Sequence, residues 1–207
     1  PDAEAAGSEI FAWDELERAF RLADVTLSPA FFDEKKLVAF NKQYIKNLPL
    51  DRFLAEVDGE LPPEWDRRRF AAIAPHIQER LERLGDAPGL VDFLFLAPGE
   101  SPTIDEAAWD KASAPEWAGP LLRDITEAYA SFGPDEWRTD TLKATMEALM
   151  LPYEVKLGKA QALPRVAVTG RSVGPPLFEA LEVLGQTETV RRTQAAVTRM
   201  GTATPPN

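Results

Sequence analysis

The sequence predicts a mainly α-helical protein with few or no strands. Apolar residues recur at helical spacing through most of the 207 residues. Alternating apolar and polar residues, which are typical of half-buried strands, are scarce. Short breaks rich in proline and glycine separate the helical segments, and no internal repeat is visible.

The first part of the chain predicts two helices after an irregular start. Residues 1–9 are acidic and lack periodicity, which indicates a linker or a frayed end. Residues 10–20 have the pattern of a short amphipathic helix, and Asp33 is placed to cap a helix that continues to about Asn47. Lysines occupy the other side of the second helix, which favours a solvated face over a face that contacts phosphates: Lys35, Lys36, Lys42 and Lys46.

The middle of the chain predicts shorter helices around a proline. A short helix over residues 51–57 precedes a break at residues 59–63. Residues 64–84 have a strong helical pattern, which Pro75 must either kink or split in two. The apolar run at residues 90–96 predicts a helical turn in the core.

The C-terminal part continues as short helices separated by loops. We expect helices over residues 104–112, 113–132, 139–150 and 188–200. Residues 156–164 have the composition of a basic connector, and the Thr/Pro-rich end from about residue 201 predicts disorder.

One stretch, Leu163–Gly185, stands out by its composition. A short apolar alternation at residues 166–168 is followed by a turn rich in glycine and proline, residues 169–176, which we call the corner. A helix begins directly after it, and two adjacent prolines can fix the backbone at a helix's first turn. Such a corner can present free N–H groups to a phosphate or a base edge, although its spacing alone favours an ordinary tight turn.

Charge is unevenly distributed along the chain. The net charge is −11, which argues against a simple basic coat for nucleic acid. Residues 151–207 nevertheless hold seven basic against four acidic residues, a balance of about +3 that leaves about −14 for the rest. This basic tail is where we expect a polyanion to bind. Its basic residues are Lys156, Lys159, Arg165, Arg171, Arg191, Arg192 and Arg199.

Several kinds of chemistry are excluded by what the sequence lacks. It has no cysteine and a single histidine, His76, so a zinc site or a Ser-His-Asp triad is not expected, and we predict a buried or half-buried structural histidine. No phosphate-binding P-loop or dinucleotide fingerprint occurs, and the carboxylates are dispersed over polar helix faces. We predict no catalytic residue and no metal site. No signal peptide and no membrane-spanning run are visible, and the first residue is Pro1, from which we expect a processed or excised portion of a longer chain.

Three stretches, in order, resemble bacterial glutamyl-tRNA synthetases. R-V-A-V-T-G and G-P-P-L-F-E-A-L-E-V-L-G in Leu163–Gly185 resemble the anticodon-binding part at the C-terminus of that family. Glu9–Asn41, with S-P-A-x-F-D-x-K-K-L, resembles the segment that follows the catalytic fold. Pro75–Phe95 resembles the family's Q-x-R-x-x-x-L stretch, here with Gln78 and Arg80. The family's HIGH-type and KMSKR-type motifs do not occur, so the resemblance implies a tRNA-binding portion that is inactive by itself.

The resemblance assigns roles to basic side chains. It implies that Arg80 contacts the third anticodon base and favours glutamate over glutamine anticodons. It implies that Arg165 contacts the base on the wobble side. Lys35 and Lys36 fall in the segment that contacts the tRNA stem.

The resemblance also assigns roles to the corner. It implies that Thr169, Gly170, Gly174, Pro175 and Leu177 form the backbone and apolar surface against which anticodon bases lie. Position 174 is glycine where some members of the family have threonine, so a hydroxyl contact is not expected there. Bases that are unstacked in this way can be bound on their Watson–Crick edges by arginine side chains.

The implied organisation has three parts. Residues 1–48 correspond to the end of a stem-contact fold, residues 49–96 to a first helical anticodon-binding subdomain, and residues 97–207 to a second. The expected partners are tRNA(Glu) and a catalytic domain in the same chain, with no membrane, in a cytoplasmic monomer. No cofactor is expected here, since ATP and Mg would bind with the catalytic domain. Two alternatives remain: a non-catalytic paralogue that binds another RNA or protein, and a purely structural helical scaffold.

Overall fold

The structure, a computed structural model, describes residues 13–25 and 33–202. Every regular element in these residues is a helix, which confirms the predicted fold class. The α-helices are α1 (Trp13–Ala19), α2 (Glu34–Asn47), α3 (Leu50–Val57), α4 (Arg67–Ile77), α5 (Ala87–Val91), α6 (Glu106–Ser113), α7 (Ala118–Ala130), α8 (Thr139–Leu149), α9 (Leu157–Ala160), α10 (Ala162–Thr169), α11 (Leu177–Leu184) and α12 (Gln186–Thr202).

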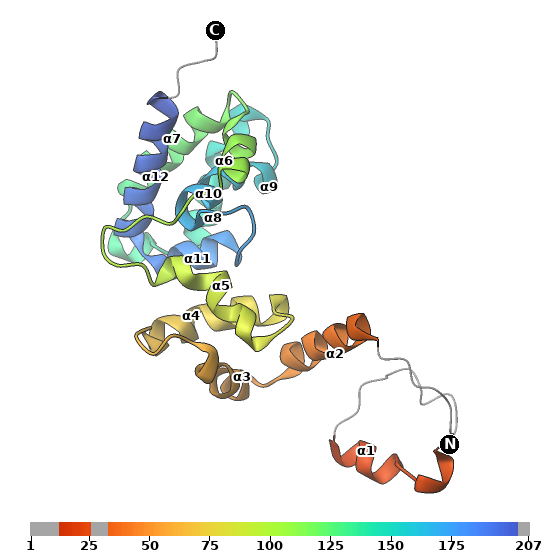
Figure 1. The fold of residues 1–207 in the computed structure, drawn as a ribbon. Helices are drawn as coiled ribbons and strands as arrows, with labels where there is room; N and C mark the ends of the chain where they lie inside the picture. The colour runs from red at the N-terminus through yellow and green to blue at the C-terminus, as the bar shows by residue number, and fades with distance from the viewer. Residues whose placement is uncertain (1–12, 26–32, 203–207) are drawn as a thin grey trace.

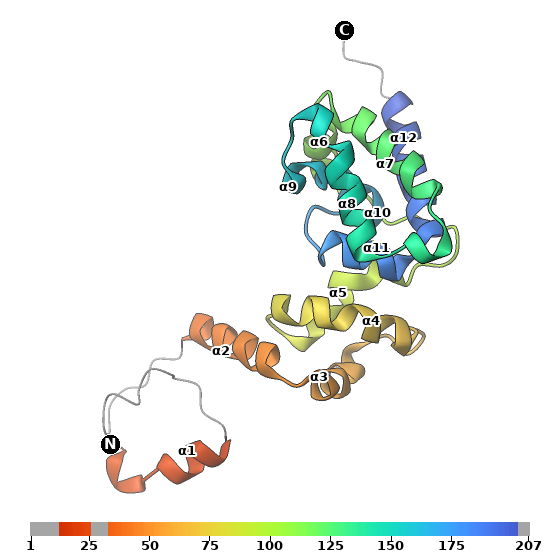
Figure 2. The same ribbon diagram turned by 180° about the vertical axis from the view of Figure 1, so that it is seen from behind.

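From α2 onward the helices follow one another along an elongated body (Figure 1). Helix α2 lies at one end, α3 to α5 form a middle layer, and α6 to α12 form a bundle at the other end. The view from behind shows the same order, with α11 at the base of the bundle next to α5 (Figure 2). The corner and α11 therefore lie where the middle layer meets the bundle.

Most predicted helices occur close to their expected bounds. Asp33 caps α2 through its carboxylate, which accepts a hydrogen bond from the Lys36 backbone N–H at 3.1 Å. Helix α4 continues through Pro75 to Ile77 and passes into a 3₁₀ turn, η4 (Gln78–Arg80), so the proline does not split it. The predicted helix at residues 10–20 is described only from Trp13 onward, and residues 1–9 lie outside the described part.

The expectation that His76 is buried or half-buried was wrong. Phe70, Ile73 and Ile77 point into the core from α4 at helical spacing. His76 lies outside this buried face, at its edge, and is exposed.

Three details of the C-terminal half also differ from expectation. The apolar alternation at residues 166–168 belongs to α10, and the expected basic connector at residues 156–164 contains α9 and the start of α10. Pro164 fits because it lies in the first turn of α10, where its missing N–H has no partner to lose. Pro176 precedes α11 as its capping residue instead of lying in its first turn. Helix α12 extends to Thr202, and only residues 203–207 of the predicted disordered end fall outside the described part.

The apolar core extends across the body. Its largest cluster contains Ile45 from α2, Phe70 from α4, Leu121 from α7 and Leu181 from α11. A smaller cluster joins α6, α7, α10 and α12 at the far side of the bundle. The predicted division at residues 48 and 96 stays a prediction.

Arginines hold the middle layer to the bundle. Arg192 on α12 is buried and donates hydrogen bonds to the carbonyls of Phe93 and Val168, both at 2.9 Å. Arg69 on α4 donates to the Leu184 carbonyl at the end of α11, at 2.9 Å. These bonds fix the surface on which the corner lies.

Candidate nucleic-acid interface

Arg165 lies on α10 and faces the corner. Its side chain is half-buried, and one guanidinium nitrogen, Nη1, donates a hydrogen bond to the Pro175 carbonyl at 2.6 Å. Burial lowers the pKa of Arg165, the positive charge of Arg80 lowers it further, and Glu179 opposes both effects. The charge of Arg80 can act in this way only if the two guanidinium groups lie near each other. The fold thus brings together the two arginines that the sequence singled out separately.

Arg80 is held in place by its neighbour Gln78. The Gln78 side chain is buried, and its amide nitrogen donates to the carbonyls of Ile45 at 2.7 Å and Leu48 at 2.8 Å. Ile45 lies in the last turn of α2 and Leu48 is the residue that ends it, a region where carbonyls lack the usual helical partners four residues on. Gln78 therefore fixes η4 against α2, while Arg80 at the end of η4 is exposed. Within the described residues Arg80 forms no ion pair, so its guanidinium group is available to a ligand.

Two residues at the start of the corner form hydrogen bonds within the protein. Thr169 is buried, and its hydroxyl lies 2.9 Å from the Arg165 carbonyl and 3.0 Å from the Arg171 carbonyl. Gly170 ends α10 with φ +80°, and its carbonyl accepts a hydrogen bond from the Asp105 N–H at 2.8 Å. The geometry gives both residues a part in shaping the corner, and their predicted contact with bases stays a prediction.

The rest of the corner presents backbone and a small apolar surface. Gly174, Pro175 and Leu177 are buried, and the Pro175 carbonyl already accepts the hydrogen bond from Arg165. Val173 is 71% exposed and projects from the same loop. The exposed apolar part of the corner is therefore Val173, which the sequence analysis did not single out.

The two predicted stem-contact lysines lie elsewhere. Lys35 and Lys36 are exposed in the first turn of α2, and the Lys36 ammonium lies 5.5 Å from the centre of the Phe40 ring. Helix α2 is at the opposite end of the body from the bundle (Figure 1). A ligand that touched both these lysines and the corner would have to extend along the body.

The basic tail divides into two groups with different roles. Its last four arginines are engaged within the fold: Arg171 with Asp92, Arg191 with Glu188, Arg192 with two carbonyls and Glu188, and Arg199 with Glu106 and the Trp109 ring. The other three, Lys156, Lys159 and Arg165, line one cavity.

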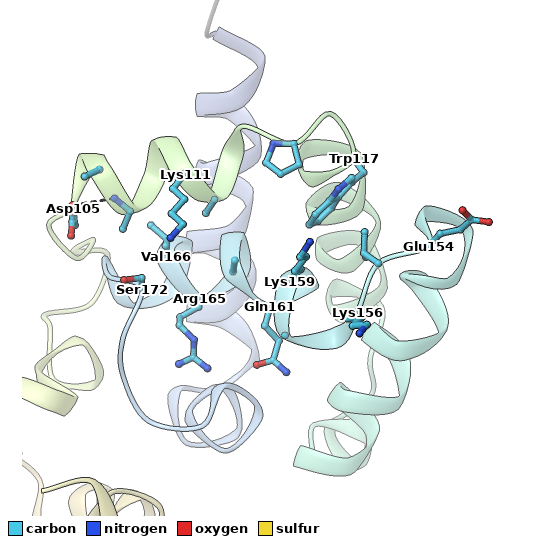
Figure 3. Close-up of a pocket in the computed structure, with 17 residues that line it drawn as sticks. Asp105, Lys111, Trp117, Glu154, Lys156, Lys159, Gln161, Arg165, Val166 and Ser172 are labelled. Carbon is cyan, nitrogen blue, oxygen red and sulfur yellow. Dashed lines mark hydrogen bonds between the residues drawn. The ribbon is translucent and has the colours of Figure 1, made fainter.

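This cavity has a volume of about 1040 Å³ and lies between α6, α9 and α10 (Figure 3). Lys111 on α6 and Trp117 before α7 also line it, and the sequence analysis found neither. Lys111 carried no signal because it is a single lysine in an amphipathic helix, and only the fold places α6 opposite α9. The charged residues of the wall are Lys111, Lys156, Lys159, Arg165, Asp105 and Glu154, so cations exceed anions.

Neither a metal site nor a membrane span is present in the part of the chain that the structure describes. No group of His, Asp or Glu side chains is arranged to hold a metal ion there. None of its helices combines the length and the apolarity that a membrane crossing requires.

Comparison with known proteins identifies the family. Residues 48–197 match the family described as "Anticodon binding domain". The chain belongs to the anticodon-binding domain family. This match covers both candidate arginines, the corner and the whole cavity, whereas Lys35 and Lys36 lie before it.

Relatives and solved structures agree with this family. The chain is 47% identical over 204 residues to a glutamate–tRNA ligase of Salinispora tropica, a match that covers 93% of the chain and 43% of that relative. It is 45% identical over 206 residues to the glutamate–tRNA ligase of Frankia alni, a match that covers 96% of the chain and 42% of that relative. The chain thus spans about two fifths of the length of these relatives.

The fold matches as well. A crystal structure of a glutamate tRNA ligase from Elizabethkingia meningosepticum in complex with its amino acid superposes with a TM-score of 0.78 at 25% identity, covering 95% of this chain and 38% of that one. A glutamate-tRNA synthetase from Elizabethkingia anophelis gives a TM-score of 0.75 at 26% identity, and the match covers 94% of this chain and 37% of that one. The resemblance to glutamyl-tRNA synthetases found in the sequence is confirmed.

Proposed function

We propose that this chain recognises the anticodon loop of tRNA(Glu) as part of a glutamate–tRNA ligase. The observation that carries the proposal is the hydrogen bond that holds Arg165 at the Pro175 carbonyl of the corner, with Arg80 near enough for its charge to act on Arg165. They come from distant parts of the sequence, and neither forms an ion pair with a carboxylate within the described residues.

The geometry suits the recognition of single-stranded bases. An arginine presents a planar fork of N–H donors that can bind a base edge in a bidentate manner. Arg165 is restrained by its bond to Pro175, so little freedom is lost when it binds a base. Val173 offers an exposed apolar surface against which an unstacked base can rest.

The joining of glutamate to tRNA belongs to the rest of the proposed protein. We expect ATP and Mg to bind in a catalytic domain of the same polypeptide, and no cofactor in this chain. We also expect a cytoplasmic monomer without a membrane partner. This chain by itself should bind tRNA but should not charge it.

The test is binding of the 207-residue chain to tRNA(Glu) and to an unrelated tRNA. Replacing Arg80 or Arg165 with Ala removes base contacts of about 1–3 kcal/mol, so affinity for tRNA(Glu) should fall by about 5- to 150-fold. Arg165→Lys keeps the charge but loses the fork, and it should recover little of the affinity. Arg123→Ala, at an exposed position on α7, is the matched control and should bind like the unchanged chain.

Equal affinity of the unchanged chain for both tRNAs would contradict the proposal. So would a normal preference for tRNA(Glu) in the chain that carries both arginine substitutions. Thermal unfolding of each variant establishes that a loss of binding is not a loss of fold.

A further inference from the structure

The cavity between α6, α9 and α10 has features of a ligand site beyond its contact with Arg165. At about 1040 Å³ it reaches the upper end of the range of about 300–1,000 Å³ that is common for ligand pockets, so it can hold a nucleotide. Lys111 lines it from α6, and Lys156 and Lys159 line it from α9 and the residue before that helix. None of the three forms an ion pair within the described residues, although the protein as a whole is acidic.

The two carboxylates of the wall do not neutralise these lysines. The Asp105 carboxylate accepts a hydrogen bond from the Ala108 N–H at 3.1 Å and so caps α6. Glu154 is exposed and has a left-handed backbone with φ 52°. In Figure 3 its carboxylate points away from Lys111 and Lys159. The middle of the cavity is therefore positive.

One wall of the cavity is aromatic. Trp117 is partly exposed and lines the cavity beside Lys159 (Figure 3). A positive groove next to an aromatic ring is the combination that binds single-stranded nucleic acid, because the lysines neutralise phosphates and bases stack on the ring. A small inorganic anion would bind the lysines but would make no stacking contact with Trp117.

We propose that this cavity binds a nucleotide that neighbours the anticodon bases, with the phosphates on its two sides at Lys111 and Lys159 and its base against Trp117. The inference rests on the proposed function, since Arg165 lines the cavity and also borders the corner. An RNA strand that passes Arg165 continues along α10 into the cavity. Arg80 and Arg165 then provide base contacts, whereas the lysines provide backbone contacts that do not depend on sequence.

The test measures the salt dependence of tRNA binding by the 207-residue chain. Each phosphate contact on a single strand contributes about 0.7 to the slope of log affinity against log salt. Lys111→Gln and Lys159→Gln should each make the slope shallower by about 0.7, and the double variant by about 1.4. Lys143→Gln is the matched control, because Lys143 is an exposed lysine on α8 that does not line the cavity.

A second readout reports on the aromatic wall. Addition of tRNA(Glu) should quench the fluorescence of the unchanged chain more than that of the Trp117→Phe variant, because stacking on a base quenches tryptophan. Slopes that stay unchanged in both lysine variants would overturn the inference, and so would equal quenching with and without Trp117.

The same measurements keep the two proposals separate. The lysine variants should lose affinity for tRNA(Glu) and for an unrelated tRNA by the same factor, so the preference stays intact. If Arg165→Ala abolishes the preference while the lysine variants keep the full slope, the proposed function stands and the cavity is not on the path of the RNA. If the lysine variants alter the slope and the unchanged chain shows no preference, the cavity binds RNA and the proposed recognition of tRNA(Glu) fails.

Discussion

Gly170 and Gly174, four positions apart at the corner, differ in the space around them. Gly170 has φ +80°, and a Cβ atom there would lie 2.2 Å from the Thr103 carbonyl oxygen, a backbone atom that cannot move away alone. At Gly174 a Cβ would lie 3.7 Å from Arg165 Nη1, which is an ordinary contact. The first glycine is required by the fold, and the second is not.

We expect Gly170→Ala to reduce the free energy of unfolding by at least about 2 kcal/mol, because a left-handed backbone alone costs an alanine about 1–2 kcal/mol. Gly174→Ala should change it by less than about 1 kcal/mol. Urea unfolding followed by circular dichroism checks both. Equal stability of the two variants would mean that the loop at Thr103 can move away from Gly170 freely.

At the scale of elements, α11 caps α8 across the bundle. Oε2 of Glu182 on α11 accepts hydrogen bonds from the backbone N–H and the hydroxyl of Thr139, both at 2.6 Å. Thr139 is the first residue of α8, where N–H groups lack helical partners. The hydroxyl bond, followed by the backbone bond and the charge of Arg138, lowers the pKa of Glu182 against the opposing effect of burial.

This cap makes stability depend on pH. Because the pKa of Glu182 is lower in the folded chain than its ordinary value of 4.5, its contribution is present above pH 4.5 and is lost as pH falls through the folded value. Glu182→Gln should therefore cost about 1 kcal/mol at pH 7, and this cost should shrink as the pH falls below 4.5 toward pH 3. Urea unfolding at the two pH values measures the difference. Glu127→Gln, at an exposed position on α7, is the control, and a Glu182→Gln deficit as large at pH 3 as at pH 7 would contradict the cap.

The sequence predicted elements well where local signals were strong. Asp33 and the apolar spacing after it located α2 to within a residue, because a cap and an amphipathic face are both local. The prediction of a connector at residues 156–164 was wrong. Gly158 and Pro164 weaken the local helical pattern there, and the short helices α9 and α10 depend on packing against the bundle. The two arginines were found through the resemblance, whereas Lys111 and Trp117 join the cavity only through contacts between elements that are remote in sequence.

At the scale of the whole molecule, Arg192 connects the layers. Its side chain is 2% exposed and bonds the Phe93 carbonyl of the middle layer and the Val168 carbonyl of the bundle. Its neighbour Arg191 is 32% exposed and pairs with Glu188 near the surface. Of these two adjacent arginines, Arg192 thus joins the two layers in the interior, whereas Arg191 makes its contacts near the surface.

Replacing Arg192 with Met leaves two carbonyls without a donor, so the free energy of unfolding should fall by about 3 kcal/mol. Arg191→Met removes a solvent-screened pair and two exposed hydrogen bonds, to the Glu100 carbonyl and the Ser101 hydroxyl, and should cost about 1 kcal/mol. Unfolding in urea, followed by circular dichroism and by tryptophan fluorescence, provides the comparison. If the two substitutions cost the same, Arg192 does not hold the layers together.

The closeness of Arg80 and Arg165 has a thermodynamic consequence for the free protein. Two like charges held near each other repel, and Glu179 offsets only part of that repulsion at Arg165. Together with burial, this repulsion disfavours the charged form of Arg165 in the free chain. In the proposed complex, a polyanion at the two arginines would offset the repulsion and stabilise the folded chain by mass action. The proposed recognition of tRNA would therefore be coupled to the stability of this part of the fold.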